Sequence, residues 1–320
     1  MTEMNRRLFS GMMLALMTPG LARAQDAATL RIAHDTPIAW LPFYVAYEKK
    51  LWQARGINPV VVPSPHGTAT LIAVAAGGGD CGVSTDLSMA IGAFNKSPAK
   101  ILASFNRVEN MELAAVKAIK SPGDLKGKKI AIVQANPSHY YFSLLLKKHG
   151  LKPSDLSIVR LGPPEMISAL NGGAIDGFVW QEPFLTQAVR LPGARFHRLA
   201  EPGLNAIHAS LIAGNTAIAK QRPVLVNALR ALGEACDYIK ANPADAISIG
   251  ARYSQMDPQI AADAITRMQI GLTNDVPTMK RLMTEEAKWA MAEGIVRPDA
   301  TMPDYEDYLD ATLLADARGS

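Results

Sequence analysis

The chain has 320 residues, of which 33 are basic, 29 are acidic and 48% are apolar. These values exclude intrinsic disorder, collagen-like repeats and small disulfide-stapled scaffolds. A single hydrophobic core rarely grows beyond about 250–300 residues, so the length predicts two lobes.

The first 24 residues are typical of a secretory signal peptide. Arg6 and Arg7 precede an apolar stretch over 8–17, and the small residues at 22 and 24 fit the cleavage rule. The stretch is too short to span about 30 Å of hydrocarbon, which excludes a membrane anchor. An N-terminal helix is the alternative interpretation. The run Arg-Arg-Leu-Phe from residue 6 also matches the core of a twin-arginine signal. Either export route predicts a periplasmic or extracellular protein.

Charge gives little information about a partner. The signal peptide carries three basic residues and one acidic residue, so it takes a net +2 of the formal +4 and leaves +2 on the mature chain. A net charge this small argues against electrostatic capture of a polyanion, and we expect no nucleic acid partner.

Cysteine and histidine spacing predicts neither a metal site nor a redox site. Cys81 and Cys236 are far apart in apolar segments, so we expect two buried free thiols rather than a disulfide. There is no Cys-x-x-Cys pair, and the six histidines form no pair at ligand spacing. We therefore expect no metal and no cofactor.

The segment 25–117 alternates strand-like and helix-like patterns. Short β-branched runs predict strands, and apolar residues at helical spacing predict helices between them. This rhythm predicts a parallel sheet with helices on both faces. Strands are expected over 30–33, 58–62, 81–84, 101–105 and 113–117, and helices over 42–52, 68–76 and 87–94.

The rhythm restarts after the turn-rich stretch 121–127 and then becomes helical. After Pro223 apolar residues recur at helical spacing almost to the end of the chain. Strands are expected over 129–133, 156–161, 175–180, 194–199 and 208–213. Helices are expected over 138–149, 164–171, 183–190, 225–241, 244–253, 258–270 and 276–293.

Motifs of catalysis are missing from the sequence. It contains no nucleophile elbow, no zinc-protease motif and no Walker loop. The glycines over 77–82 satisfy Gly-x-Gly-x-x-Gly, but they follow a helix and enter a strand. A dinucleotide-binding loop leaves a strand and enters a helix. We therefore expect a binding protein rather than an enzyme.

Small polar residues follow four of the predicted strands, where open α/β sheets bind ligands. Helix N-termini at this edge offer free N–H groups that suit anions. Each cluster is also consistent with ordinary helix capping. Four clusters, two in each unit, favour a ligand cleft between two lobes. The clusters lie at 64–68, 84–86, 136–139 and 180–183.

A family resemblance is carried by the segments 41–48, 56–57, 80–85, 119–129, 171–183 and 241–246. On these segments the sequence resembles the periplasmic solute-binding proteins of ABC importers. It is similar to the nitrate, sulfonate and taurine branch, which is related to binders of thiamine pyrimidine precursors. The resemblance covers residues 30–310. The chain departs from the family pattern at Asn136-Pro137, where Gly-Ser is usual, and Pro137 lacks an N–H donor.

The resemblance implies an α/β protein with the type II periplasmic-binding-protein fold, in which two crossover segments join two doubly wound lobes. Lobe I would comprise 25–117 and 207–320, and lobe II 118–206. Ligand binding would close the lobes by a hinge motion, and the closed form would dock on a membrane permease. The ligand-binding wall would comprise Trp40, His66, Ser84 and Thr85 of lobe I, and Asn136, Ser138, His139, Trp180 and Glu182 of lobe II.

Alternatives remain open for three wall residues and for the ligand. Trp180 could pack in the core, Glu182 could cap a helix and His139 could lie on the surface. We expect a monomer that binds a small organic ligand, with a sulfonate or nitrate-type anion as first choice. An aromatic or pyrimidine-type ligand is the alternative, and Glu182 would favour a ligand amine if it faced inward. A ligand sensor and a pyrimidine-precursor synthase are further alternatives.

Overall fold

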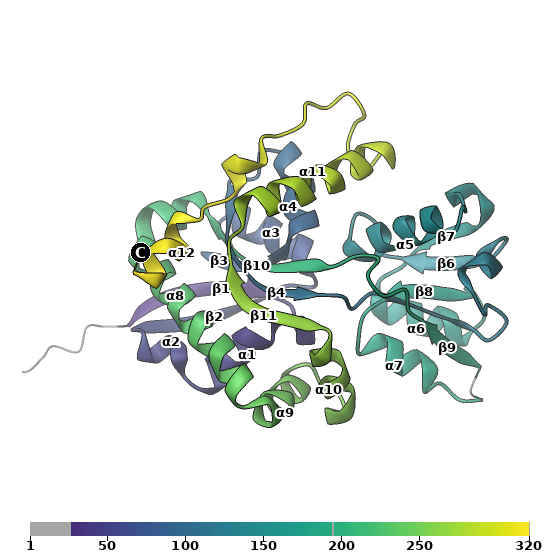
Figure 1. Cartoon of the computed structure of the whole chain (residues 1–320), viewed down its shortest axis with the longest axis horizontal. Helices are drawn as coiled ribbons and strands as arrows, with labels where there is room; N and C mark the ends of the chain where they lie inside the picture. The colour runs from purple at the N-terminus through teal and green to yellow at the C-terminus, as the bar shows by residue number, and fades with distance from the viewer. Residues whose placement is uncertain (1–26, 194, 320) are drawn as a thin grey trace, which may run out of the picture.

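Two α/β lobes lie side by side along the long axis of the molecule (Figure 1). The structure, a computed structural model, describes residues 27–193 and 195–319. The signal peptide predicted over 1–24 lies outside the described residues.

Lobe I is built on a six-stranded sheet with the order β11-β4-β10-β3-β1-β2. β1 is parallel to β2 and β3, as the strand–helix rhythm predicts. β10 runs antiparallel to β3 and β4, so the sheet is mixed and the prediction of a wholly parallel sheet is wrong. β10 enters from the other lobe and follows no crossover helix, so nothing imposes the parallel direction on it. The strands are β1 (Ala28–His34), β2 (Ile57–Pro63), β3 (Cys81–Thr85), β4 (Ala99–Val108), β10 (Ile207–Gly214) and β11 (Met268–Thr273).

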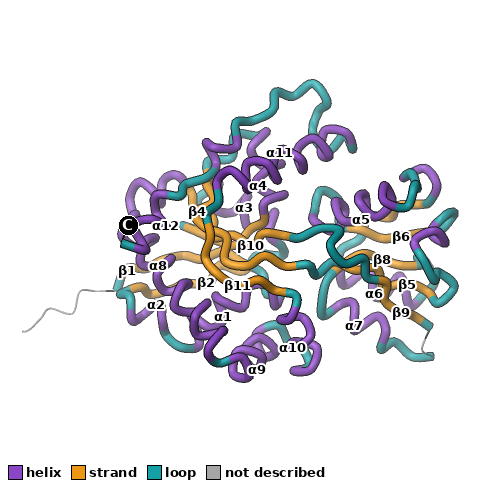
Figure 2. Tube along the Cα trace, in the orientation of Figure 1, coloured by secondary structure: helices purple, strands orange, loops and turns teal. Residues whose placement is uncertain are grey.

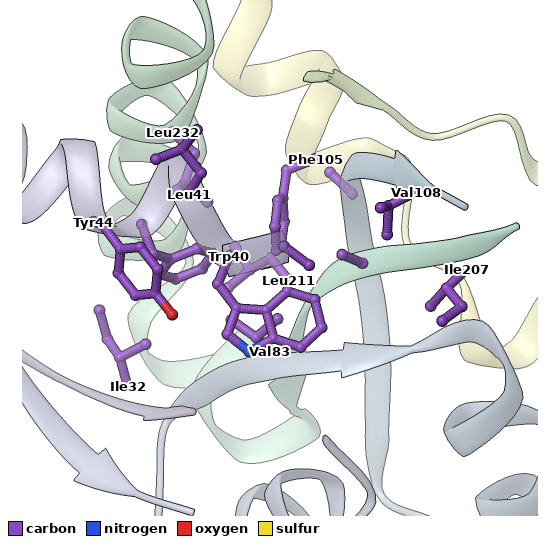
Figure 3. Close-up of a cluster of buried hydrophobic side chains, with 14 of the residues drawn as sticks. Ile32, Trp40, Leu41, Tyr44, Val83, Phe105, Val108, Ile207, Leu211 and Leu232 are labelled. Carbon is purple, nitrogen blue, oxygen red and sulfur yellow. The ribbon is translucent and has the colours of Figure 1, made fainter. Parts of the chain in front are cut away.

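Helices cover both faces of this sheet. Ile32 and Ala33 of β1 point to opposite faces because side chains alternate along a strand. Ile32 packs in one core with Tyr44 and Leu232 (Figure 3), and Ala33 packs in another with Met283. The helices are α1 (Leu41–Glu48), α2 (Leu51–Ala54), α3 (Gly67–Ala75), α4 (Asp86–Phe94), α8 (Asn215–Ala241), α9 (Pro243–Tyr253), α10 (Pro258–Thr266), α11 (Val276–Ala292) and α12 (Thr312–Arg318).

Lobe II is built on a five-stranded sheet with the order β7-β6-β8-β5-β9. β6 is parallel to β7 and β8, whereas β5 is antiparallel to β8 and β9. Leu170, Phe178 and Phe196 are buried in its core. The strands are β5 (Glu112–Val116), β6 (Lys129–Ile132), β7 (Ser157–Arg160), β8 (Gly177–Trp180) and β9 (Phe196–Leu199), and the helices are α5 (Pro137–Lys148), α6 (Pro163–Asn171) and α7 (Phe184–Val189).

Two segments of the described chain join the lobes (Figure 2). Residues 109–111 lead from β4 to β5, and residues 200–206 lead from β9 to β10. β5 pairs with β8 and β9, so it belongs to the second sheet, although the expected boundary at residue 117 assigned it to lobe I. We therefore propose that lobe II comprises 112–199 and that the two crossovers form the hinge.

The predicted helix over 258–270 is wrong at its C-terminal end. α10 ends at Thr266, and Met268–Thr273 form β11 at the edge of the lobe I sheet, antiparallel to β4. Met268, Ile270 and Leu272 alternate with other residues in this segment, which is a strand pattern of period two. Because the residues before Met268 have helical spacing, the predicted helix was extended into this strand segment.

α8 begins earlier than its sequence pattern suggests. It starts at Asn215, and its helical geometry breaks at Gln221, two residues before Pro223. Pro223 therefore stands near the start of the second helical segment, where a missing N–H group is tolerated. The strong apolar periodicity belongs to this second segment alone.

Cys81 and Cys236 are free and buried, as the sequence predicts. Burial raises the pKa of both thiols, that of Cys236 to about 12, so neither forms a reactive thiolate at neutral pH. We expect Ellman's reagent to label neither thiol in the folded protein and both after denaturation in guanidinium chloride. Rapid labelling of the native protein would contradict the buried positions.

Candidate ligand-binding cleft

A cavity of about 250 Å³ lies between the two lobes. His66, which follows β2, lines it from lobe I. Lobe II contributes residues at the C-terminal ends of β6, β7 and β8, including Gln134, Arg160 and Trp180. Open α/β sheets bind ligands at this edge. This cavity is therefore the candidate site, although larger cavities of about 530, 420 and 320 Å³ are present, the second of them at the two crossovers.

Trp180 and Arg160 give the cavity an aromatic wall and a cation. Trp180 ends β8, is 7% exposed and packs against the core of lobe II as well as lining the cavity. The core-packing and ligand-wall roles predicted for Trp180 are thus compatible. Arg160 ends β7, and no carboxylate in the described chain forms an ion pair with it. An arginine stays charged at physiological pH, so this cavity favours an anion.

His66 caps α3 and presents a hydrogen-bond donor. Its Nδ1 accepts a hydrogen bond from the Ala69 backbone N–H at 3.3 Å, which places the ring proton on Nε2. Burial lowers the pKa of His66, so the ring is neutral at neutral pH. The arrangement leaves Nε2–H available to a ligand.

Ser84 and Thr85 position the helices of the lobe I wall. The buried Ser84 Oγ donates a hydrogen bond to the Gly67 carbonyl at 2.9 Å, which ties β3 to the start of α3. Thr85 Oγ1 accepts from the Ser88 backbone N–H at 3.2 Å and caps α4. These hydrogen bonds tie β3 to α3 and cap α4.

Asn136 and Ser138 make similar contacts at the start of α5. Asn136 Oδ1 accepts from the Ser138 backbone N–H at 3.1 Å, and Ser138 Oγ accepts from the Val133 backbone N–H at 3.2 Å. Pro137 is the first residue of α5 and brings no N–H group. The start of α5 therefore offers few free donors to an anion.

His139 is not on the surface. It lies where α5 of lobe II meets α11 of lobe I, a contact that we call the joint between the lobes. It is 7% exposed, and its ring meets that of Trp289 of lobe I edge to face, with centroids 5.0 Å apart. Burial, and secondly the charge of Arg160, lowers the pKa of His139 to about 4. His139 Nδ1 is buried and has no hydrogen-bond partner in the described chain.

Trp40 lies outside the cavity, in the core of lobe I. Its ring meets Phe105 edge to face (Figure 3). Its Nε1–H donates to Asp35 Oδ1 at 2.7 Å. Burial raises the pKa of Asp35 to about 6, although this hydrogen bond opposes the shift. Trp40 therefore supports the loop after β1 rather than the cavity wall.

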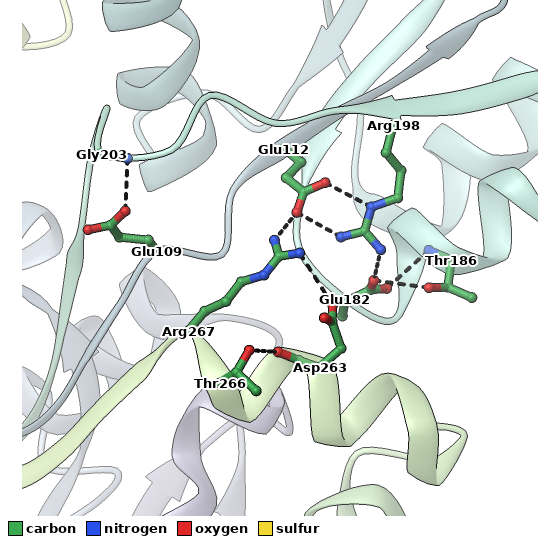
Figure 4. Close-up of polar contacts among 9 residues, drawn as sticks. All are labelled: Glu109, Glu112, Glu182, Thr186, Arg198, Gly203, Asp263, Thr266 and Arg267. Atoms are coloured by element: carbon green, nitrogen blue, oxygen red, sulfur yellow. Dashed lines mark hydrogen bonds and ion pairs between the residues drawn. The ribbon is translucent and has the colours of Figure 1, made fainter.

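Glu182 belongs to a polar network at the hinge (Figure 4). Its carboxylate accepts from the Thr186 backbone N–H and hydroxyl at 3.0 Å, and it pairs with Arg198. These contacts are those of a cap of α7, so they favour the capping alternative over a ligand amine partner. Arg198 also pairs with Glu112 at 2.7 Å, and Glu112 pairs with Arg267 of lobe I.

Four further polar side chains, those of Arg160, Asp86, His208 and Glu286, are not among the predicted wall residues. Arg160 is the penultimate residue of the predicted strand 156–161, and Asp86 belongs to the predicted polar cluster 84–86, so both had a positional signal. His208 pairs with Asp86 at 2.9 Å from 122 residues away. Glu286 lies on α11, and no local pattern connects it with Asp86.

Two α/β lobes with a cavity at their facing strand ends, joined by paired crossovers, define a two-lobed solute-binding protein of the type II periplasmic-binding-protein fold. Residues 38–246 match the family described as NMT1/THI5 like. The chain belongs to this family.

Known proteins with similar sequences are binding proteins. A protein of Brucella abortus (strain 2308) with the name "Putative binding protein BAB2_1146" is 27% identical over 79% of this chain and 80% of its own length. The taurine-binding periplasmic protein of Escherichia coli is 34% identical over 36% of each chain. The structure of the alkanesulfonate-binding protein SsuA of Xanthomonas axonopodis pv. citri, bound to MOPS, superposes with a TM-score of 0.77 at 19% identity, covering 88% of this chain and 98% of that one.

Over residues 27–193 and 195–319, no helix is long and apolar enough to cross a membrane. In the same residues no group of three or more His, Cys, Asp or Glu side chains is arranged to hold a metal ion.

Proposed function

We propose that this protein is the periplasmic substrate-binding component of an ABC importer and captures a small organic anion, first of all a sulfonate, between its lobes. The observation that carries the proposal is the inter-lobe cavity of about 250 Å³ with Arg160 and Trp180 in its wall. Family membership and the sulfonate and taurine ligands of the similar proteins support it.

The charge and hydrogen-bonding groups of the cavity suit a sulfonate. The Arg160 guanidinium donates hydrogen bonds in a fixed fork that matches an oxyanion. His66 Nε2–H is a second donor, and α3 begins at Gly67 beside it. The positive end of a helix dipole favours negative charge. Trp180 would cover the apolar part of the ligand.

Binding would then draw the lobes together. The ligand contacts His66 of lobe I and Arg160 of lobe II, so it favours the closed arrangement by its contacts with both walls. The hinge would lie in the crossovers at 109–111 and 200–206. The closed form would be recognised by the membrane permease of the importer, after export directed by the segment 1–24.

An aromatic or pyrimidine-type ligand is the second candidate. The Trp180 indole in the wall and the neutral His66 ring favour it, since aromatic rings stack on one another in offset or edge arrangements. Such a ligand would not depend on Arg160.

A panel of thermal shifts separates the two candidates. A ligand at 100 times its Kd stabilises a protein by about 2.7 kcal/mol, which raises the melting temperature of a chain of this size by about 5 °C. We expect this shift with ethanesulfonate or taurine. A shift with an aminopyrimidine and none with any sulfonate would contradict the first choice.

Arg160→Gln is expected to weaken sulfonate binding about tenfold or more, because it removes a charge-assisted hydrogen bond at the anion. The fold should persist, since Arg160 has no ion pair in the described chain. Lys126→Gln is the matched control, because Lys126 is exposed in the turn before β6, at the other end of that strand. Isothermal titration calorimetry measures both, and equal Kd values would show that Arg160 does not hold the anion.

A further inference from the structure

Glu286 is a buried carboxyl group that lacks a partner. It lies on α11, is 5% exposed, and its Oε2 is buried without a hydrogen-bond partner in the described chain. Buried polar groups in folded proteins are nearly always hydrogen-bonded, so an exception needs an explanation. Here the unpaired oxygen indicates a group that binds from outside the chain.

A second carboxylate stands next to Glu286. Asp86, the first residue of α4, is 2% exposed, and its Oδ2 contacts His208 Nδ1 at 2.9 Å. α4 and α11 pack against each other. Burial, and secondly the charge of Asp86, raises the pKa of Glu286 well above its usual value. This shift favours the protonated form of Glu286 when nothing is bound.

Aromatic rings from both lobes meet beside this pair. Trp289 follows Glu286 by three residues, on the same face of α11. From α5 of lobe II, His139 and Tyr140 pack on the Trp289 ring, with centroids 5.0 and 4.9 Å away. Burial and then the charges of Glu286, Glu285 and Asp86 raise the pKa of Tyr140 to about 12.

We propose that this joint is a cation subsite, in which Glu286 and Asp86 receive an ammonium group of the ligand and the rings of Trp289 and Tyr140 cover it. Carboxylates and aromatic faces together are the usual partners of an organic ammonium group. The Arg160 charge acts on His139, whose ring meets that of Trp289, so His139 connects the two subsites.

The subsite narrows the proposed function, on which it rests, to a zwitterionic ligand. The acidic group would face Arg160 and the ammonium group would face Glu286. When the ammonium group enters, Glu286 gives its proton to the solvent and its carboxylate pairs with the cation. No other group in the joint is proposed to change its protonation. The groups that face Glu286 there are Asp86, His208, Glu285, Tyr140 and Tyr305.

Two probes that differ only in the ammonium group test the proposal: taurine and ethanesulfonate, titrated calorimetrically into the wild type and Glu286→Gln. We expect the wild type to bind taurine about tenfold or more tightly than ethanesulfonate, as one charge-assisted hydrogen bond would give. In Glu286→Gln the two affinities should become nearly equal through loss of taurine binding. Glu48→Gln is the control, since Glu48 is exposed on α1, away from the joint, and pairs with Arg252 at 2.8 Å.

The outcomes of these titrations distinguish failure of the cation subsite from failure of the proposed function. Equal binding of the two probes by the wild type overturns the cation subsite and leaves the proposed function standing. A preference for taurine that survives in Glu286→Gln also overturns the subsite. Binding of neither probe overturns the proposed function and the subsite together.

Proton release gives a second test in the unmutated protein. Titrations at pH 7 in buffers of different ionisation enthalpy should report about one proton released per taurine and none per ethanesulfonate, because only the ammonium group ionises Glu286. Release of no proton with tightly bound taurine would contradict the role of Glu286, whether or not Glu286→Gln folds.

Discussion

Glu112→Gln is expected to lower the free energy of unfolding by about 2 kcal/mol and the melting temperature by about 4 °C. The Glu112 side chain is 4% exposed and is shared by Arg198 of lobe II and Arg267 of lobe I (Figure 4). Removing its charge leaves two guanidinium groups facing a neutral amide. The arginine side chains are 24% and 35% exposed, so water offsets part of this loss and the effect stays below that of a fully buried pair.

The difference in the free energy of unfolding between wild type and Glu112→Gln should depend on pH in a defined direction. Burial alone would raise the pKa of Glu112, but hydrogen bonds and charges from Arg198 and then Arg267 outweigh it and lower the pKa below its usual 4.5. A carboxyl group with a lowered pKa stabilises the folded state above its unfolded pKa, and this stabilisation is lost as the pH falls through the folded pKa. Wild type and Glu112→Gln should therefore differ fully at pH 7 and converge in acid.

Urea unfolding at pH 7 and at about pH 3 measures both effects. The control is Asp263→Asn, which removes the other carboxylate that contacts Arg267. The Asp263 side chain is 59% exposed, so we expect less than about 0.5 kcal/mol from this change. Equal losses in the two variants would mean that Glu112 is not the centre of the network.

Gly82→Ala is expected to destabilise the protein by about 3 kcal/mol or to prevent folding. A Cβ atom at this position of β3 would lie 2.6 Å from the Ala33 carbonyl oxygen and 2.6 Å from Thr70 Cγ2. The backbone oxygen cannot move without separating β1 from β3. Because β3 carries Ser84 and Thr85, the same strain would reach the lobe I wall of the cleft.

The same substitution elsewhere provides the control. In Gly233→Ala, on α8, the nearest atom would be Leu272 Cδ1 at 3.5 Å, an ordinary contact. Alanine favours a helix over glycine, so we expect this variant to gain about 0.5 kcal/mol or more. The urea midpoints of the two variants should shift in opposite directions, and a tolerated Gly82→Ala would contradict the close approach of β1 and β3.

Much of the fold could be predicted from the local order of residues. The strand–helix rhythm predicts the parallel core strands β1, β2 and β3, and it places polar residues such as His66 at their C-terminal ends. It could not predict the antiparallel direction of β10, because that strand's pairing depends on where the chain re-enters lobe I. β11 was not predicted because Met268–Thr273 continue the apolar content of the preceding helix.

At the site, too, the positions that depend on local sequence could be predicted, and those that depend on distant contacts could not. Trp180 and His66 line the cavity because a position at a strand end is a local property. Glu182, by contrast, contacts Arg198 and Thr186, and Trp40 contacts Asp35 and Phe105, so their side chains serve the fold. The joint of Asp86, Glu286 and Trp289 joins residues about 200 positions apart, and no sequence pattern relates them.

A crystal structure of the protein with taurine tests the central claim most directly. We expect the sulfonate oxygens within hydrogen-bond distance of the Arg160 guanidinium, the Trp180 ring beside the ligand, and the lobes closed over it. A ligand bound away from the inter-lobe cavity would contradict the account. Binding in the cavity of about 530 Å³ lined by Arg55 and Arg230 would be such a result.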